Sequence, residues 1–430
     1  MATRETPARL RNLQRALYRR AKDDRRFRAY ALYDKVSRPD ILAHAYALAK
    51  ANGGASGPDG CTFEQIEADG REALLTELRE ALSTKTYRPG PVRRVYIPKL
   101  NGGERPLGIP NIRDRVVQTA VKLLLEPLFE ADFEPDSFGF RPRRAAHDAL
   151  DAIREALETG MCWVIDADVT AYFDTIPHDR LMKAVAERVV DGAMLALVKR
   201  FLEAPIIDER DGGRPRRPPQ GTPQGGVISP LLANVYLHLL DRNFRTHVSR
   251  GELSGRLIRY ADDFVLLTSH RPDQERLWLD RLMGRLGLTL HPEKTRVLDA
   301  RRERFVFLGH VHQWRAGRVY LDIAPKALRR IRDHERQQTR HTGWSLPHLV
   351  GELNPYVRGA RYYFRRVRRR TLRTLDYFLE QRFARWDARK HNRSRPTWSL
   401  VYGQALWRRH GLERWDLPVA LRPVDARRAR

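Results

Sequence analysis

The sequence predicts a mixed α/β fold with antiparallel hairpins, followed by a strongly basic C-terminal quarter. Two short apolar runs at 257–258 and 264–267 flank the acidic turn at 260–263, as in two strands joined tightly. Residues 163–169 alternate apolar and acidic, as a single strand does. Apolar residues elsewhere recur mostly at helical spacing. Strands and helices are therefore expected to alternate along the first three quarters of the chain.

The first expected elements are basic helices. Leu10 and Leu13 belong to a helical apolar pattern within residues 1–50. A glycine-dense loop at 52–60 follows, and Thr62 then suits the N-cap of the next helix. The basic helices fit equally well as an ordinary surface pair or as a nucleic-acid-contacting extension.

A second hairpin is expected over residues 92–110. Two strand-like stretches there flank an Asn-Gly turn at 101–102. The hairpin carries Lys99 and Arg105, and basic residues in such a place can bind a triphosphate. They are also typical of edge strands that avoid aggregation, so the pattern alone leaves both readings open.

Two further helices follow this hairpin. Apolar spacing predicts them over 114–128 and 145–157, with a turn-rich stretch at 138–142 between them. A long loop is expected at 208–219, where glycine, proline and arginine are frequent.

Acidic residues mark the ends of the expected strands. Asp166 and Asp168 lie on one face of the strand at 163–169, and Asp262 and Asp263 form the hairpin tip. A solvated Asp-Asp turn is common, so the turn alone is a weak signal. Adjacent carboxylates repel unless a cation lies between them, and a third carboxylate from the other strand would complete a site for paired Mg²⁺ ions. Such a site supports phosphoryl transfer.

A glycine-rich loop at 221–226 leads into another helix. Ser229 is a suitable N-cap and Pro230 a suitable first helical residue, with apolar positions recurring as far as Leu240. Glycines permit close approach to a nucleotide, and the amide of Gln224 could hydrogen-bond it. Taken alone, the pattern favours a simple loop before a core helix.

Composition limits the class of protein. The formal charge is +27, and residues 326–430 hold 27 Lys and Arg against 9 Asp and Glu, hence +18 of that excess. A polyanionic partner such as nucleic acid would explain it. Two cysteines, Cys61 and Cys162, cannot build a disulfide framework, which favours a reducing cytoplasm. No apolar stretch is long enough for a membrane span, and no signal peptide is apparent.

The order of these motifs resembles the polymerase core of reverse transcriptases, specifically the group II intron type of bacteria and organelles. The matching strings lie at 52–60, 92–110, 113–118, 137–142, 147–150, 163–178, 221–241, 260–264, 286–295, 307–309 and 353–359. The resemblance implies a right-hand polymerase with α/β fingers and palm, an antiparallel palm sheet and an all-helical thumb.

The resemblance also implies catalytic roles. Asp168, Asp262 and Asp263 match the family's metal ligands, and Val169 matches the residue that adds a backbone carbonyl. Two Mg²⁺ ions are the implied cofactors, with Mn²⁺ as a substitute. Lys294 stands where a lysine proposed to protonate pyrophosphate would lie.

Substrate contacts carry over in the same way. Lys99 and Arg105 match finger residues on the incoming triphosphate, and Gln224 matches the residue beside the nucleotide sugar. Phe173 matches the aromatic residue that blocks a ribose 2′-hydroxyl. Ala171 departs from the pattern, since many relatives have glycine there.

The basic C-terminal quarter is expected to bind nucleic acid. Arg358, Arg361, Arg365 and Arg366 are interleaved with aromatic residues, so that one helix face could pack while the other contacts phosphates.

Four regions are expected: a basic helical extension at 1–50, fingers and palm at 51–315, a maturase X-like thumb at 316–395 and a basic segment at 396–430. The last segment fits either a small DNA-binding segment or a frayed basic tail. No cysteine- and histidine-containing endonuclease motif follows Arg395, as in the shorter, endonuclease-lacking bacterial branch.

The expected partners are an RNA template, intron RNA, a DNA primer or target and deoxynucleotides, without a membrane. A bacterial cytoplasmic location at the nucleoid is implied. Two alternatives remain open: a reverse transcriptase recruited to host defence, CRISPR-associated or similar, and a non-catalytic RNA-binding maturase.

Overall fold

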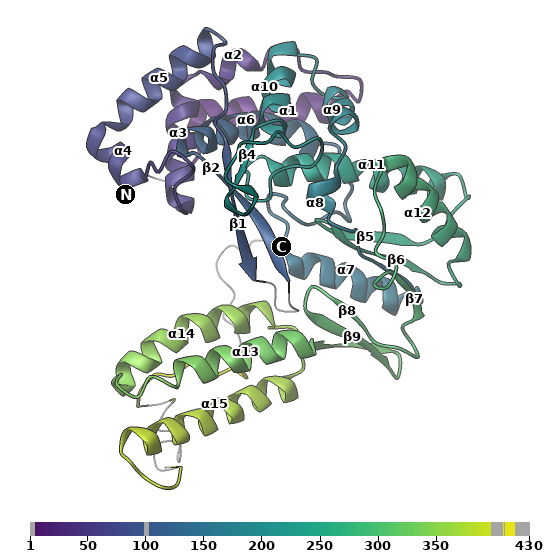
Figure 1. Ribbon diagram of the computed structural model, residues 1–430. Coiled ribbons are helices and arrows are strands. Elements are labelled where there is room, and N and C mark those ends of the chain that lie inside the picture. The colour runs from purple at the N-terminus through teal and green to yellow at the C-terminus, as the bar shows by residue number, and fades with distance from the viewer. Residues whose placement is uncertain (1–4, 99–102, 397–406, 408, 418–430) are drawn as a thin grey trace. The chain divides into compact units, whose positions relative to one another are not determined.

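The structure is a computed structural model that describes residues 5–98, 103–396, 407 and 409–417. Its internal contacts divide the chain into two compact units, each drawn from two stretches of sequence. Unit 1 comprises Met1–Ala149 and Ile165–Arg296, and unit 2 comprises Leu150–Val164 and Val297–Arg430. The fold is mixed α/β with antiparallel strand pairs, as predicted (Figure 1).

Helices make up most of unit 1. They are α1 (Ala8–Asp23), α2 (Tyr33–Val36), α3 (Pro39–Asn52), α4 (Phe63–Asp69), α5 (Arg71–Ser83), α6 (Ile112–Glu130), α8 (Tyr172–Thr175), α9 (His178–Ala186), α10 (Gly192–Leu202), α11 (Ser229–Ser249) and α12 (Asp273–Leu286). Helix α7 (Ala146–Glu158) begins in unit 1 and continues into the sequence of unit 2. Helix α6 is buried along most of its length and packs against α1 and α3 (Figure 1).

Local signals in the sequence account for several helix positions. Thr62 and Gln65 form a capping box at the start of α4, which confirms the predicted N-cap. The predicted N-cap at Ser229 is wrong, because α11 begins at Ser229 itself and Ile228 precedes it. Its apolar face also continues beyond Leu240, so the helix runs on to Ser249.

One three-stranded sheet in unit 1 has the order β2-β1-β4. Strands β1 (Val92–Pro98) and β2 (Glu104–Pro110) are antiparallel, which confirms the predicted hairpin, and β4 (Ile206–Asp208) runs parallel to β1. The predicted turn at 101–102 lies outside the described residues.

The acidic hairpin belongs to a four-stranded sheet with the order β5-β6-β3-β7. Its strands are β3 (Trp163–Ala167), β5 (Arg256–Tyr260), β6 (Asp263–Thr268) and β7 (Arg296–Asp299). Strands β5 and β6 are antiparallel, which confirms the predicted hairpin. The predicted tip of Asp262 and Asp263 is wrong by one residue, because Tyr260 pairs with Asp263 and only Ala261 and Asp262 form the turn. Because β3 lies next to β6, strands nearly a hundred residues apart in sequence become neighbours.

Unit 2 contains a second three-stranded sheet and three long helices. They are β8 (Phe305–Phe307), β9 (His310–Arg315), β10 (Arg318–Ile323), α13 (Pro325–Gln338), α14 (Leu346–Tyr363) and α15 (Arg369–Lys390). The segment expected to be all-helical from residue 316 begins instead with β10. That strand pairs antiparallel with β9 and buries Val319, Leu321 and Ile323, which alternate along it.

Both cysteines are free thiols. Across the described parts of the chain, no helix combines the length and the apolar character that crossing a membrane requires.

Candidate active site

The acidic hairpin holds Asp262 in an unusual turn and Asp263 at the start of the strand that follows it. Ala261 has φ of +59°, a left-handed conformation that costs alanine about 1–2 kcal/mol. Asp262 has no positive φ, so the turn has the φ pattern of type II′, whose first position usually holds glycine. Strain of this kind tends to persist at functional sites.

Asp168 follows β3, and its backbone is fixed by the segment before β7. The amide of His291 donates to the carbonyl of Asp168 (2.7 Å), and that of Thr170 donates to the carbonyl of Thr289 (2.9 Å). In this antiparallel bridge between Val169 and Leu290, the amide and carbonyl of Val169 face the opposite side. The Val169 carbonyl is therefore directed away from Leu290.

The carboxylates of the two regions interact electrostatically. Desolvation, followed by the charges of Asp262, Asp168 and Asp166, raises the pKa of Asp263 to about 7. Desolvation also raises the pKa of Asp262, and the charge of Asp168 adds to that effect. The pKa of Asp166 rises to about 6, chiefly through burial, although Arg296 lies 3.6 Å away. The acids that the sequence singled out are thus close enough to oppose one another's ionisation.

A lysine places a positive charge next to the carboxylate of Asp168. Lys294 Nζ lies 2.9 Å from Asp168 Oδ2, so the structure brings together these two predicted residues. Within the described residues, no group of three or more Asp, Glu, His or Cys side chains is arranged to hold a metal ion.

The donor set nevertheless suits a divalent cation. Three carboxylates and one carbonyl are the hard oxygen ligands that Mg²⁺ prefers, and a cation between them would offset the mutual repulsion that adds to burial in raising the pKa of Asp263. The metal site itself stays a prediction.

Phe173 and the glycine-rich loop are joined by backbone hydrogen bonds. The Thr222 amide donates to the Phe173 carbonyl (2.7 Å), and the Gly221 amide donates to the Ile176 carbonyl (2.8 Å). A Cβ on Gly221 would lie 2.8 Å from the Phe173 carbonyl oxygen, and its φ is +87°. Ala171, which precedes this turn, has φ of +46°, the conformation that explains why glycine suits its position.

The same loop also packs against β2. The Gly108 amide donates to the Gln224 carbonyl (2.5 Å), and a Cβ on Gly225 would lie 2.4 Å from the Gly108 carbonyl oxygen. Gln118 on α6 accepts from the Val227 amide (2.9 Å). Tight packing between Gly225 and Gly108 therefore fixes the backbone position of Gln224.

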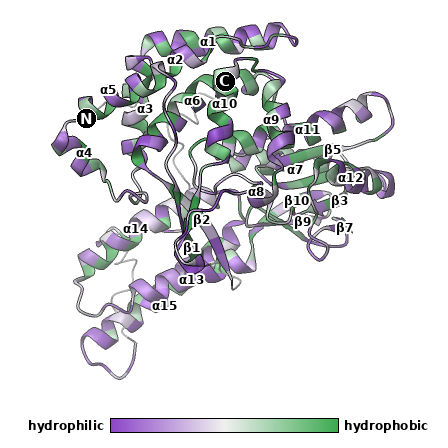
Figure 2. Ribbon diagram, turned by 45° about the horizontal axis from the view of Figure 1, so that its top comes forward, coloured by the Kyte–Doolittle hydropathy of each residue, from purple (hydrophilic) through white to green (hydrophobic). Residues whose placement is uncertain are grey.

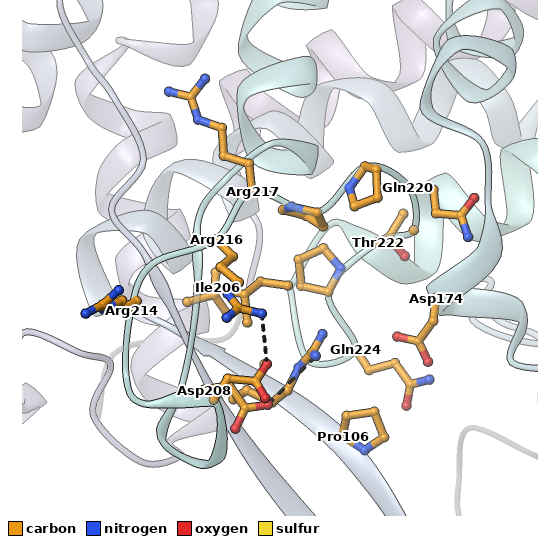
Figure 3. A pocket seen from close by; sticks show the side chains of 18 residues that line it. Pro106, Asp174, Ile206, Asp208, Arg214, Arg216, Arg217, Gln220, Thr222 and Gln224 are labelled. Atoms are coloured by element: carbon orange, nitrogen blue, oxygen red, sulfur yellow. Dashed lines mark ion pairs between the residues drawn. The ribbon is translucent and has the colours of Figure 1, made fainter.

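A pocket of about 370 Å³ opens beside Gln224. Figure 3 shows Gln224 and Asp174 on one side of it and Arg214, Arg216 and Arg217 on the other. Arginines of the predicted loop at 208–219 thus line a space next to a predicted substrate residue.

The two predicted finger residues have different outcomes. Arg105 is an exposed residue of β2, and its charge lowers the pKa of both Asp262 and Asp263, which places it near the acids. Lys99 lies outside the described residues.

The four arginines predicted to bind nucleic acid contact other parts of unit 2. Arg358 and Arg361 both pair with Glu413, at 3.3 and 2.9 Å, and Arg361 is buried. Arg366 pairs with Asp151, and the Arg365 guanidinium stacks over Tyr362 at 4.3 Å. Their predicted role stays untested, but much of their charge is already engaged.

A different set of arginines gathers between α13 and α15. Desolvation and then the charges of Arg389, Arg385, Arg336 and Arg340 lower the pKa of Arg382 to about 10. Arg332 and Arg336 also lie over the ring of Phe378, at 5.4 and 5.2 Å. We call Arg332, Arg336, Arg340, Arg382, Arg385 and Arg389 the α13–α15 arginine face. Sequence reasoning missed it because α15 begins 31 residues after α13 ends, so the proximity of the two helices depends on the fold.

Sequence reasoning also missed Arg259. This residue stands in the buried strand β5 directly before the acidic hairpin and is 0% exposed. The available signal was an arginine between the apolar pair Leu257-Ile258 and the acidic turn.

Comparisons with known proteins identify the family of the chain. Residues 97–312 match the family described as "Reverse transcriptase (RNA-dependent DNA polymerase)", and residues 327–402 match "Group II intron, maturase-specific domain". Among solved structures, apo telomerase from Candida tropicalis aligns with 55% of each chain at 14% identity and a TM-score of 0.42, too low to carry an argument.

Two bacterial relatives are similar in sequence. Protein YkfC of Escherichia coli is 36% identical over 336 residues, which cover 69% of this chain and 87% of that protein. The group II intron-encoded protein LtrA of Lactococcus lactis is 40% identical over 213 residues, which cover 49% of this chain but 34% of LtrA. The chain belongs to the reverse transcriptases, the RNA-directed DNA polymerases, and carries the maturase-specific domain of group II intron proteins.

Proposed function

We propose that the chain extends a DNA primer on an RNA template by two-metal phosphoryl transfer, and that it binds its intron RNA to assist splicing and mobility. The observation that carries the proposal is the electrostatic convergence of Asp168 with Asp262 and Asp263. Residues 51–315 would then form the fingers and palm, and residues 316–395 the thumb. The basic segment at 396–430, most of which lies outside the described residues, would bind target DNA.

The carboxylates of Asp168, Asp262 and Asp263, with the Val169 carbonyl, would hold the cations. Paired Mg²⁺ ions would activate the primer 3′-hydroxyl and stabilise the pyrophosphate leaving group. Asp168 would have to exchange its ion pair with Lys294 for metal ligation. That exchange would free the Lys294 ammonium to donate a proton to pyrophosphate.

Neighbouring side chains would select and orient the nucleotide. Arg105, with Lys99, would bind the triphosphate. The charge of Arg105 already lowers the pKa of Asp263, so this arginine lies near the acids. The ring of Phe173 would exclude a 2′-hydroxyl, and it is supported by an edge-on contact with Phe140 at 6.4 Å. Gln224 would hydrogen-bond near the nucleotide sugar.

The α13–α15 arginine face would bind RNA phosphates. Arg340, Arg385 and Arg389 are exposed, and among the described residues none of these three forms an ion pair. Figure 2 shows α13 as mostly hydrophilic. Guanidinium groups that repel one another are stabilised when RNA phosphates neutralise their charge. The phosphates release their own counterions as they bind.

Primer extension by an Asp262→Ala variant tests the polymerase proposal. On an RNA template with Mg²⁺, the wild-type chain should incorporate deoxynucleotides, and the variant should be slower by roughly 10³-fold or more, because cation charge stabilisation is worth several kcal/mol. RNA affinity should not change. A matched variant of a surface acid, Asp69→Ala, should keep full activity.

Two outcomes would contradict the proposal. Undiminished synthesis by Asp262→Ala would overturn the metal assignment. A wild-type chain that binds RNA without extending any primer would instead support the non-catalytic maturase alternative.

A further inference from the structure

Arg259 forms a buried hydrogen-bond network behind the acidic hairpin. Its Nε donates to Asp241 Oδ1 (2.9 Å), and its Nη2 donates to Asp241 Oδ2 (2.5 Å) and to Ser137 Oγ (2.8 Å). Its Nη1 donates to Asn234 Oδ1 (3.0 Å) and to the carbonyl of Ala261 (2.9 Å). A single side chain thus connects α11, the loop at residue 137 and the turn that carries Asp262.

The backbone of Arg259 is held as firmly as its side chain. Its amide donates to the Asp136 carbonyl (2.9 Å), and its carbonyl accepts from the Phe138 amide (2.8 Å). Because strand and side chain are both fixed, the guanidinium has a defined position from which to hold the Ala261 carbonyl.

Gly139 closes the other side of the turn. A Cβ on Gly139 would lie 2.1 Å from the Ala261 nitrogen, so the turn packs directly against the backbone there. Asn234 donates from Nδ2 to the Gly139 carbonyl (2.8 Å) while accepting from Arg259. Asn234 therefore links the two groups that confine Ala261.

The turn needs such support. Ala261 holds a left-handed conformation that alanine disfavours, and only the surrounding contacts can maintain it. A buried guanidinium is costly unless all of its donors are paired. Here the Asp241 carboxylate neutralises the positive charge of Arg259, and the Ala261 carbonyl accepts a hydrogen bond from one of the remaining N–H groups.

We propose that Arg259 is a positioning residue for DNA synthesis, which fixes Asp262 and Asp263 through the Ala261 carbonyl. The inference rests on the proposed function. Arg259 touches neither substrate nor cation, so its effect should fall on the geometry of the carboxylates. A displacement of about 1 Å at a reacting centre can lower a rate about 10²-fold.

The matched control is Arg188. This residue is also buried (4% exposed) and pairs with one carboxylate, Asp132, at 2.6 Å. It donates to the carbonyls of Asp24 and Phe27 instead of to the hairpin. Arg188→Lys should therefore cost similar stability without displacing Asp262.

The experiment compares Arg259→Lys with Arg188→Lys in the full chain. Primer extension at saturating Mg²⁺, well below both melting temperatures, should show kcat reduced about 10²-fold in Arg259→Lys, with the dNTP KM within about threefold of wild type. Mn²⁺ binding, followed by electron paramagnetic resonance without substrate, should weaken about tenfold in Arg259→Lys alone.

A folded Arg259→Lys with wild-type kcat and Mn²⁺ affinity would overturn the inference, as would equal losses in Arg188→Lys. If Arg259→Lys does not fold, Asn234→Ala decides by the same two measurements, because it removes the link between Arg259 and Gly139. An inactive wild-type chain would overturn the proposed function and the inference together. An active one with normal variants would overturn only the inference.

Discussion

At the scale of the residue, burial decides which groups carry charge. Glu335 on α13 is 0% exposed and accepts from Trp415 Nε1 at 3.1 Å. Burial, with a smaller contribution from the charge of Asp376, raises its pKa to about 8, although Arg332 and Arg382 oppose the shift. Glu335 is therefore protonated in the folded chain at neutral pH and ionised in the unfolded chain.

Glu335→Gln should stabilise the protein at high pH. Between its ordinary pKa near 4.5 and about 8, the folded state holds a proton that the unfolded state lacks, so wild-type stability falls as pH rises through that window. Glutamine cannot ionise. The variant should gain roughly 4 kcal/mol over wild type at pH 8 and nothing below pH 4.5, measured by urea unfolding. The exposed Glu352→Gln should show no such trend, and a flat difference for Glu335→Gln would contradict the prediction.

At the scale of the element, two helices make a charged surface that neither makes alone. Helix α13 supplies Arg332 and Arg336, Arg340 follows its end, and α15 supplies the other members of the α13–α15 arginine face. Like charges on adjacent helices destabilise the free chain, so an anion that binds there relieves repulsion as well as forming contacts.

Removing two of these arginines should weaken the salt dependence of RNA binding. In the double variant Arg340→Gln, Arg385→Gln, the slope of log affinity against log salt should fall by about 1.8 for duplex RNA or about 1.4 for single strands. Filter binding across 50–300 mM salt measures this slope. The range includes 0.1 M, where charges are screened over about 10 Å. The control is the double variant Arg271→Gln, Arg276→Gln, which removes the same charge from α12 and from the segment directly before it. An unchanged slope in the first pair would show that the face does not contact RNA.

At the scale of the whole molecule, each compact unit is assembled from two separated stretches. Residues 150–164 belong with the C-terminal part of the chain, and the Cys162 carbonyl accepts from the Ala300 amide at 2.8 Å. The apolar residues Ile153 and Leu157 of α7 are buried. Neither unit can therefore be removed by one cut without separating stretches that pack together.

A chain ending after Arg296 should fold poorly. Two or three exposed apolar side chains of α7 would cost on the order of 5 kcal/mol at about 1.5–3 each. Urea unfolding and sedimentation should show lower stability and self-association, and co-expression of residues 297–430 should restore both. A monomeric, cooperatively unfolding truncated chain would show that residues 150–164 need no partner.

Much of the secondary structure could be read from the sequence. Hydrophobic periodicity located α6, α7 and the two hairpins, and Thr62 marked the start of α4, because these signals depend on neighbours along the chain. Strand β10 and the exact start of α11 were missed. The family resemblance had assigned β10 to the all-helical thumb, although its apolar residues alternate as in a strand. Helix α11 begins one residue earlier than the predicted N-cap implied.

The candidate site divides in the same way. The sequence by itself determined which residue types could do chemistry: the Asp262-Asp263 turn, Asp168 at a strand end and the glycines around Gln224. Only the tertiary structure decided that β3 lies beside β6, that Lys294 pairs with Asp168, and that Arg259 supports the hairpin. The reason is physical. Periodicity and turn preferences act over a few residues, whereas strand order, charge pairing and burial depend on segments that meet only when the chain has folded.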